Sequence, residues 1–266
     1  MFLPQKGIRL PGVMVAVTIL LAGCAGIPVK HATARVRPEN VLILLYHHIA
    51  DLPAMASRAQ KRWTLSPRKF EAHLEWIASH GFSPITMAQL IAHLKHGVPL
   101  PPKPIVISFD DGWKDQYPTA YQSLKKHNFL ATFFIVTDSV GHSAFMNWEQ
   151  LQEMSAAGMD IQPHSLTHPR LTELEGHDLR REIVESKKIL ENRLNKQVAV
   201  FSYPFGSYND TVIAMVKSAG FEGAVSVSGF NGGYLFRNDQ SYTLVRYPVE
   251  SDVNLGEIAR LKGFDY

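Results

Sequence analysis

Two adjacent carboxylates, Asp110 and Asp111, follow an apolar run at residues 105–109 and precede Gly112. A β-branched apolar run is typical of a buried strand, and the carboxyl ends of such strands hold the chemistry of open α/β sheets and barrels. Neighbouring aspartates repel each other, so one pKa rises unless a cation lies nearby or the two residues act separately as metal ligand and base. A solvated Asp-Gly turn explains this stretch equally well.

A second candidate group is the pair His164 and His168. Histidines four residues apart can present both imidazoles on one side of a helical turn, as in divalent-metal sites. The chain has 12 histidines, so this spacing alone is weak evidence. In a βα fold, however, these residues and the Asp pair both follow strands. Two imidazoles and one carboxylate can then meet at one rim and leave a metal position open for water or substrate.

A third candidate stretch runs from Phe201 to Asp210 and also follows an apolar run. Its proline and glycine, Pro204 and Gly206, shape a loop whose backbone N–H groups can face a developing oxyanion. Its aromatic side chains can pack on a sugar face. Taken alone, the stretch is better explained as an ordinary turn with aromatic packing.

The elements that position these groups alternate between strands and helices. Such alternation implies parallel pairing in a barrel or a doubly wound sheet. Apolar runs predict strands at residues 41–46, 105–109, 131–136, 159–162, 198–202 and 223–227. Helical spacing and capping residues predict helices that start at Ser66-Pro67 and at Thr86, followed by helices at 119–127, 148–157, 178–194 and 210–219.

The composition is that of a globular chain of 266 residues, enough for one large α/β domain or two small ones. The formal net charge is +3, but Lys6 and Arg9 lie in the first 23 residues. Without that segment 25 basic and 24 acidic residues remain. A net charge of +1 gives no electrostatic reason to expect nucleic-acid binding.

The first 23 residues have the basic start, the apolar run at 13–22 and the small residues of a secretory signal. Residues 21–24, Leu-Ala-Gly-Cys, resemble a bacterial lipobox, which implies cleavage before Cys24 and its lipidation. The alternative is an uncleaved anchor, but the apolar run is short for a bilayer span. Cys24 is the only cysteine, so an exported chain could form no internal disulfide.

We therefore expect a signal peptide at 1–23, a tether at 24–40 and one domain at 41–266. The protein would be exported and anchored to the cell envelope through a lipid on Cys24. In an organism with an outer membrane, Ala25 lacks the aspartate that signals inner-membrane retention. The expected location there is the periplasmic face of the outer membrane.

Together the three motifs resemble the NodB-type polysaccharide deacetylases, carbohydrate esterase family 4. Residues 108–112, 164–168 and 203–206 occur in the family's order and spacing, and the resemblance runs from about residue 41 to 249. It implies a distorted (β/α) barrel with parallel strands. It also implies hydrolysis of N-acetyl groups on an N-acetylhexosamine polysaccharide, with poly-β-1,6-N-acetylglucosamine favoured over peptidoglycan or chitin-type oligomers.

The resemblance implies that Asp110 is the general base and that Asp111, His164 and His168 hold a divalent metal. Zinc is the expected ion, with cobalt, nickel or iron as alternatives. A backbone N–H near Tyr203 to Phe205 would help to hold the tetrahedral oxyanion. We expect substrate contacts from three aromatic residues: Trp113, Phe205 and Tyr208.

Two departures from the family pattern matter. Ser202 stands where the family usually carries an arginine that orients the base, and Arg246 is the candidate substitute. No histidine follows His177, although the family usually supplies a late histidine as general acid. Either His47 or His48 takes that role, with His47 as our candidate, or metal-bound water and solvent do.

The sequence leaves two rival functions open. The first is a carbohydrate-binding lipoprotein that has the same fold but little or no activity. The second is a metal-dependent amidohydrolase of a small non-sugar amide. The expected partners are an N-acetylated polysaccharide and a membrane, with no nucleic acid and with any export machinery unspecified.

Overall fold

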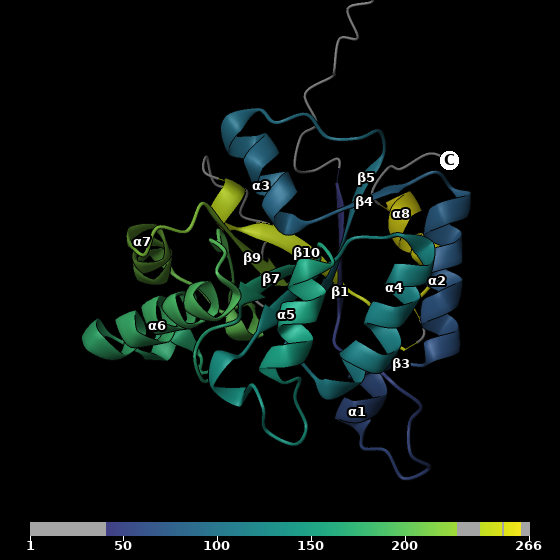
Figure 1. The fold of residues 1–266 in the computed structure, drawn as a ribbon, viewed down its shortest axis with the longest axis horizontal. Helices are drawn as coiled ribbons and strands as arrows, with labels where there is room; N and C mark the ends of the chain where they lie inside the picture. The colour runs from purple at the N-terminus through teal and green to yellow at the C-terminus, as the bar shows by residue number, and fades with distance from the viewer. Residues whose placement is uncertain (1–40, 228–239, 252, 262–266) are drawn as a thin grey trace, which may run out of the picture. The chain divides into compact units, whose positions relative to one another are not determined.

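The structure is a computed structural model that describes residues 41–227, 240–251 and 253–261 (Figure 1). The predicted signal peptide, the tether and Cys24 lie outside these ranges. Within them, no helix combines the length and the apolar character needed to cross a bilayer.

Parallel strands form an eight-stranded sheet in the order β7-β6-β5-β1-β10-β9-β8, with β4 beside the start of β5. Within the described residues, all strand pairings of this sheet are parallel, as the alternation of strands and helices predicts. A separate two-stranded sheet joins β2 (His48–Ile49) to β3 (Thr64–Leu65). The strands of the main sheet are β1 (Leu42–Tyr46), β4 (Ser83–Ile85), β5 (Pro104–Phe109), β6 (Thr132–Ile135), β7 (Asp160–Pro163), β8 (Val200–Ser202), β9 (Gly223–Val227) and β10 (Leu244–Pro248).

The first and last strands of this order, β7 and β8, are joined by side chains rather than by a ladder. The Gln162 Oε1 atom accepts hydrogen bonds from the backbone N–H groups of Ala199 at 3.1 Å and Val200 at 3.0 Å. A side-chain amide therefore satisfies donors that an adjacent strand would otherwise pair. The sheet is nearly closed as a barrel, which confirms the predicted distorted (β/α) barrel.

Helices surround this sheet (Figure 1). Predicted caps are present: the Ser66 side chain accepts from the Lys69 N–H, and Thr86 and Gln89 form a reciprocal capping box. The helices are α1 (Arg58–Trp63), α2 (Pro67–Ser79), α3 (Met87–His96), α4 (Gln122–His127), α5 (Trp148–Ala156), α6 (Gly176–Leu194), α7 (Asp210–Ser218) and α8 (Leu255–Leu261).

Differences from the predicted elements have local causes. The predicted helix at 119–127 begins earlier, with a π-helical turn at Tyr117–Tyr121 that leads into α4. Helix α1 was not predicted because it buries no residue and so has no apolar stripe. Strand β4 was not predicted because it has only three residues and one is Pro84.

Alternation along the strands places apolar side chains and polar site residues on the same face of the sheet. Val106 of β5, Val200 of β8 and Leu244 of β10 belong to one buried cluster, which also contains residues of α3. Positions an even number of residues further along these strands point the same way. At the carboxyl ends of the strands these positions are Asp110, Ser202 and Arg246.

Candidate active site

A buried ion pair between Asp110 and Arg246 lies at the centre of the site. The guanidinium donates from Nη1 to Asp110 Oδ1 at 2.6 Å and from Nη2 to Oδ2 at 2.7 Å. Nη2 also donates to Ser202 Oγ at 2.8 Å, and the guanidinium carbon lies 5.0 Å from the centre of the Phe134 ring. Arg246 is fully buried and Asp110 is 2% exposed, so the bidentate geometry is fixed.

The electrostatic surroundings keep Asp110 ionised. Burial by itself raises the pKa of Asp110. The adjacent Arg246 guanidinium, with smaller contributions from His164 and His47, outweighs burial and holds the pKa well below its usual value. The side chain is therefore a carboxylate at neutral pH.

Three potential ligand atoms, contributed by Asp111, His164 and His168, lie close together beside this ion pair. The two Nε2 atoms are 3.2 Å apart, and Asp111 Oδ1 lies 3.7 Å from His164 Nε2 and 3.5 Å from His168 Nε2. The Nδ1 atom of His164 donates to the Ser202 carbonyl at 2.9 Å, which leaves its Nε2 lone pair facing the other two atoms.

This arrangement fits a divalent metal ion. Tetrahedral zinc with bonds of about 2.0–2.1 Å would separate its ligand atoms by about 3.3–3.4 Å. The three measured separations, 3.2, 3.5 and 3.7 Å, bracket that range. One anionic oxygen and two neutral imidazoles are also a donor set that zinc-type ions accept.

Backbone strain is concentrated at the site. Four of its non-glycine residues have left-handed φ values: Asp111 at 73°, Ser165 at 65°, His168 at 67° and Phe205 at 58°. Such conformations are costly for residues with a Cβ atom, and they cluster where surrounding structure fixes a functional geometry. Gly112, at φ 80°, also has little space, because a Cβ there would lie 3.1 Å from a side-chain carbon of Ile135.

The loop that carries both histidines is held by the Glu182 side chain from α6. Its carboxylate accepts from the backbone N–H groups of Leu166 at 3.0 Å and Thr167 at 2.9 Å, and from the Thr167 hydroxyl at 2.8 Å. The Ser165 hydroxyl accepts from the His168 N–H at 2.9 Å. Sequence reasoning missed Glu182, although a charged residue within the apolar stripe of a predicted helix is a recognisable signal.

Trp113 supports Asp111 through a side-chain hydrogen bond. Its indole Nε1 donates to Asp111 Oδ2 at 2.9 Å. The rings of His48 and Phe145 stack on the indole with centroid distances of 4.4 and 4.5 Å. These rings cover part of the indole, and contact of Trp113 with substrate stays a prediction.

In the third motif, the Tyr203 N–H is ruled out as the oxyanion donor. This N–H donates to the carbonyl of Val225 at 3.1 Å, so it cannot face an oxyanion. Pro204 has no N–H, and the Gly206 N–H donates back to Tyr203. Within residues 203–206, all of which the structure describes, the Phe205 N–H is the one backbone donor that forms no hydrogen bond.

The aromatic side chains of this loop have different environments. Phe205 is 40% exposed, and its ring centre lies 4.6 Å from the His168 ring and 4.6 Å from the Arg170 guanidinium carbon. Tyr208 instead packs against Tyr203, with ring centroids 5.1 Å apart. Phe205 therefore lies beside one of the candidate metal ligands, whereas Tyr208 packs against the buried Tyr203.

The two candidate acids lie at the end of β1. Burial lowers the pKa of His47, and the carboxylates of the Asp110–Asp111 pair oppose that effect. Its ring packs on Trp63, with centroids 4.5 Å apart. His48 has its Nδ1 atom 2.7 Å from a carboxylate oxygen of Asp115. The carboxylates of the site therefore act on the pKa of His47, whereas His48 is paired with Asp115.

Comparisons with known proteins agree with this site. The sequence profile described as "Polysaccharide deacetylase" matches residues 97–224. A Bacillus subtilis (strain 168) protein named as a polysaccharide deacetylase, YxkH, is 30% identical over 213 residues, or 80% of this chain and 72% of that protein. A poly-β-1,6-N-acetyl-D-glucosamine N-deacetylase of Staphylococcus aureus (strain MSSA476) is 25% identical over 250 residues, or 86% of this chain and 85% of that protein.

A solved structure extends the match to three dimensions. The Streptococcus pyogenes deacetylase PplD, solved in complex with acetate, superposes with a TM-score of 0.72 at 25% sequence identity. The match covers 83% of this chain and 96% of that chain. The fold, the profile and the relatives agree, and the chain belongs to the polysaccharide deacetylase family of enzymes.

Proposed function

We propose that the protein hydrolyses N-acetyl groups on an N-acetylhexosamine polysaccharide, with poly-β-1,6-N-acetylglucosamine as the favoured polymer. The Staphylococcus aureus relative supports this polymer, because it acts on that glycan by name and matches 86% of this chain. The observation that carries the proposal is the position of Asp110. Its Oδ2 atom lies 3.5 Å from His164 Nε2, at the edge of the candidate ligand triangle.

In this proposal Asp111, His164 and His168 hold the ion, with zinc as the expected species. A bound divalent ion would polarise the N-acetyl carbonyl and lower the pKa of water, which an unactivated amide requires at neutral pH. The ionised Asp110 carboxylate orients the water and accepts its proton. Arg246 keeps both carboxylate oxygens in place during that transfer.

The oxyanion that develops on the acetyl carbonyl oxygen needs a hydrogen-bond donor. We assign this role to the Phe205 N–H, because its neighbours in the loop lack a donor or have already used it. The half-exposed Phe205 ring beside His168 would contact the sugar at the same time. His47 remains the proposed acid for the leaving amine.

The export of the protein and its lipid anchor at Cys24 are part of the same proposal. An enzyme that acts on an exported glycan benefits from attachment at the envelope, and residues 1–24 have the required signal. Metabolic labelling with an alkyne fatty acid would test the anchor. We expect label on the wild-type chain and none on Cys24→Ser; equal labelling of both would contradict the proposal.

A substrate panel tests the proposed activity. Acetate release is measured from β-1,6-linked N-acetylglucosamine oligomers, chitin oligomers, peptidoglycan fragments and simple N-alkyl acetamides, with and without a chelator. We expect the fastest release from β-1,6-linked oligomers and loss of activity on chelation. Release from simple acetamides alone would favour a small-amide hydrolase, and no release from any substrate would favour a binding protein.

A further inference from the structure

Glu182 is a buried carboxylate on the apolar face of α6. It is 6% exposed, and the same face buries Leu179, Ile183 and Leu190. Burying a carboxylate is costly unless it is paired and hydrogen-bonded. Across residues 41–227, 240–251 and 253–261, Glu182 forms no ion pair with a lysine or arginine. Its compensation comes instead from three hydrogen-bond donors on one loop.

Those donors lie between the two histidines of the candidate metal site. Glu182 Oε2 binds the N–H groups of Leu166 and Thr167, and Oε1 binds the Thr167 hydroxyl. The loop has strained, left-handed residues on both sides of this contact, Ser165 and His168. A loop with such a backbone keeps its geometry only where other contacts fix it. Glu182 supplies that restraint from a rigid helix.

The charge of Glu182 also suits a cation. Three carboxylates lie in or behind the site, on Asp110, Asp111 and Glu182, and Arg246 supplies one positive charge. When ionised, these groups leave two uncompensated negative charges beside the two imidazoles. A divalent ion would balance them.

We propose that Glu182 is a positioning residue of the metal site. It holds the loop so that His164 and His168 present their Nε2 atoms 3.2 Å apart, and its charge strengthens the attraction for the ion. This inference rests on the proposed metal site. Outer-shell partners of metal ligands commonly change metal affinity by about 10–100-fold when they are removed.

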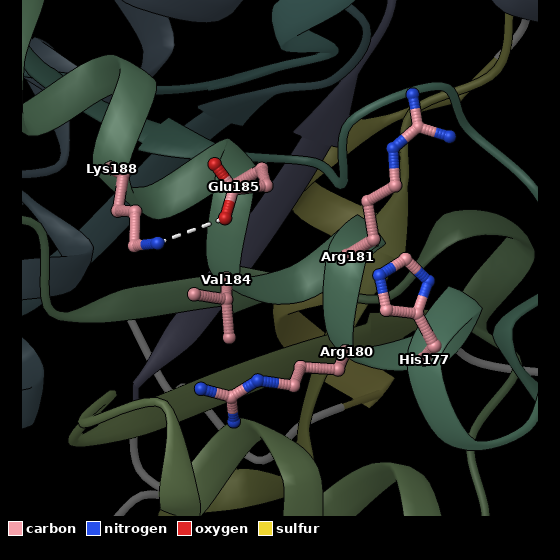
Figure 2. A pocket seen from close by; sticks show the side chains of 6 residues that line it. All are labelled: His177, Arg180, Arg181, Val184, Glu185 and Lys188. Atoms are coloured by element: carbon pink, nitrogen blue, oxygen red, sulfur yellow. Dashed lines mark hydrogen bonds and ion pairs between the residues drawn. The ribbon is translucent and has the colours of Figure 1, made fainter.

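Glu185 on the same helix provides a matched control. Figure 2 shows Glu185 near Lys188 in a hollow lined by residues of α6, with an ion pair of 2.9 Å between them. Its side chain is 45% exposed, and within the described residues it makes no hydrogen bond or ion pair with the histidine loop. Glu185→Gln therefore removes the same charge from the same helix without loosening that loop.

The test measures metal affinity on the full-length chain. Each protein is stripped with a chelator, and Co²⁺ is titrated while the visible absorption is followed. We expect Glu182→Gln to weaken Co²⁺ binding by about 10–100-fold. Glu185→Gln should change it by less than about twofold. Melting of the metal-free proteins separates positioning from stability, because a merely structural role lowers the melting temperature and leaves the affinity of the folded protein unchanged.

Two further variants make each outcome decisive. If His168→Ala binds Co²⁺ as tightly as wild type, the metal site itself fails. If His168→Ala loses binding while folded Glu182→Gln keeps wild-type affinity, the Glu182 inference alone is overturned. Should Glu182→Gln not fold, Thr167→Val removes the hydroxyl donor to Oε1 and should weaken binding by about five- to tenfold. Wild-type affinity in Thr167→Val would then overturn the inference.

Discussion

Arg246 on β10 holds both carboxylate oxygens of Asp110, the residue that follows β5, although β1 lies between β5 and β10 in the sheet. The guanidinium therefore reaches its partner within the barrel, past an intervening strand. Ser202, at the position where an arginine was expected, has a side chain short enough to leave room for it and accepts one of its hydrogen bonds. The arginine that pairs with the proposed base therefore comes from β10 instead of β8.

Replacing the proposed base should separate chemistry from metal binding. We expect Asp110→Asn to lower kcat for acetate release by about 10²–10⁴-fold, because a general base typically contributes that much. Metal affinity should remain close to wild type, since Asp111 and the two histidines are unchanged. Steady-state kinetics and Co²⁺ titration check the two parts. Substantial deacetylase activity in the folded variant would show that another group is the base.

Removing the guanidinium should destabilise the fold. Arg246→Met leaves Asp110 buried without its cation, which typically costs about 3–5 kcal/mol of unfolding free energy. Arg246→Lys keeps a charge but not the bidentate geometry, so its loss should be smaller. Ser202→Ala removes a single acceptor and should cost about 1 kcal/mol. Urea unfolding measures all three, and equal stability of Arg246→Met and wild type would contradict the assigned importance of the pair.

Metal removal should abolish turnover reversibly. We expect a strong chelator to stop acetate release, and added Zn²⁺ to restore it, because the amide carbonyl then regains its electrophilic partner. In His168→Ala the same Zn²⁺ addition should restore little, since one of three ligands is missing. Unchanged acetate release after exhaustive chelation would argue against metal dependence.

The indole of Trp113 should tune the same site through Asp111. Trp113→Phe keeps an aromatic ring that can stack with His48 and Phe145. It loses the indole N–H that donates to Asp111 Oδ2. We expect metal binding about tenfold weaker, because a hydrogen bond that orients a charged ligand is lost. Trp148→Phe, on α5, is the control and should bind metal as wild type does. If Trp113→Phe and Trp148→Phe bind the metal with the same affinity, the Trp113 indole does not support the metal site.

Stability should fall in acid partly through His73. Burial lowers the pKa of His73 to about 4, whereas the unfolded side chain titrates at 6.5. The unfolded chain therefore binds the proton first. The contribution of His73 to stability is complete above pH 6.5 and is lost as pH falls toward 4.

A comparison of variants isolates this effect. Between pH 7 and pH 4, protonation linked to His73 should lower the unfolding free energy of the wild-type protein by on the order of 3 kcal/mol. One pKa unit corresponds to about 1.4 kcal/mol. His73→Gln should flatten the difference between urea unfolding at pH 7 and at pH 4. His177→Gln, whose side chain is 86% exposed, should keep the wild-type pH dependence. Parallel curves for wild type and His73→Gln would refute the assignment.

The sequence by itself determined the features that depend on neighbouring residues. Apolar runs and capping residues located most strands and helices, because a strand's alternation and a helix's ends are encoded locally. The same logic placed Asp110, Asp111, His164 and His168 after strands. Their convergence then followed from the shared direction of parallel strands.

Only the tertiary structure decided which distant groups touch. The Asp110–Arg246 contact joins residues 136 positions apart, and the Glu182 contacts depend on the rotation of α6 against the histidine loop. The expectation for Tyr203 changed for the same reason, because Val225 accepts its N–H, and only the fold shows that the His48 and Phe145 rings stack on Trp113. Hydrogen-bond partners and stacked rings are supplied by other strands and loops. Residue type and spacing can therefore identify a candidate site residue, but the groups that it contacts are fixed only when the barrel assembles.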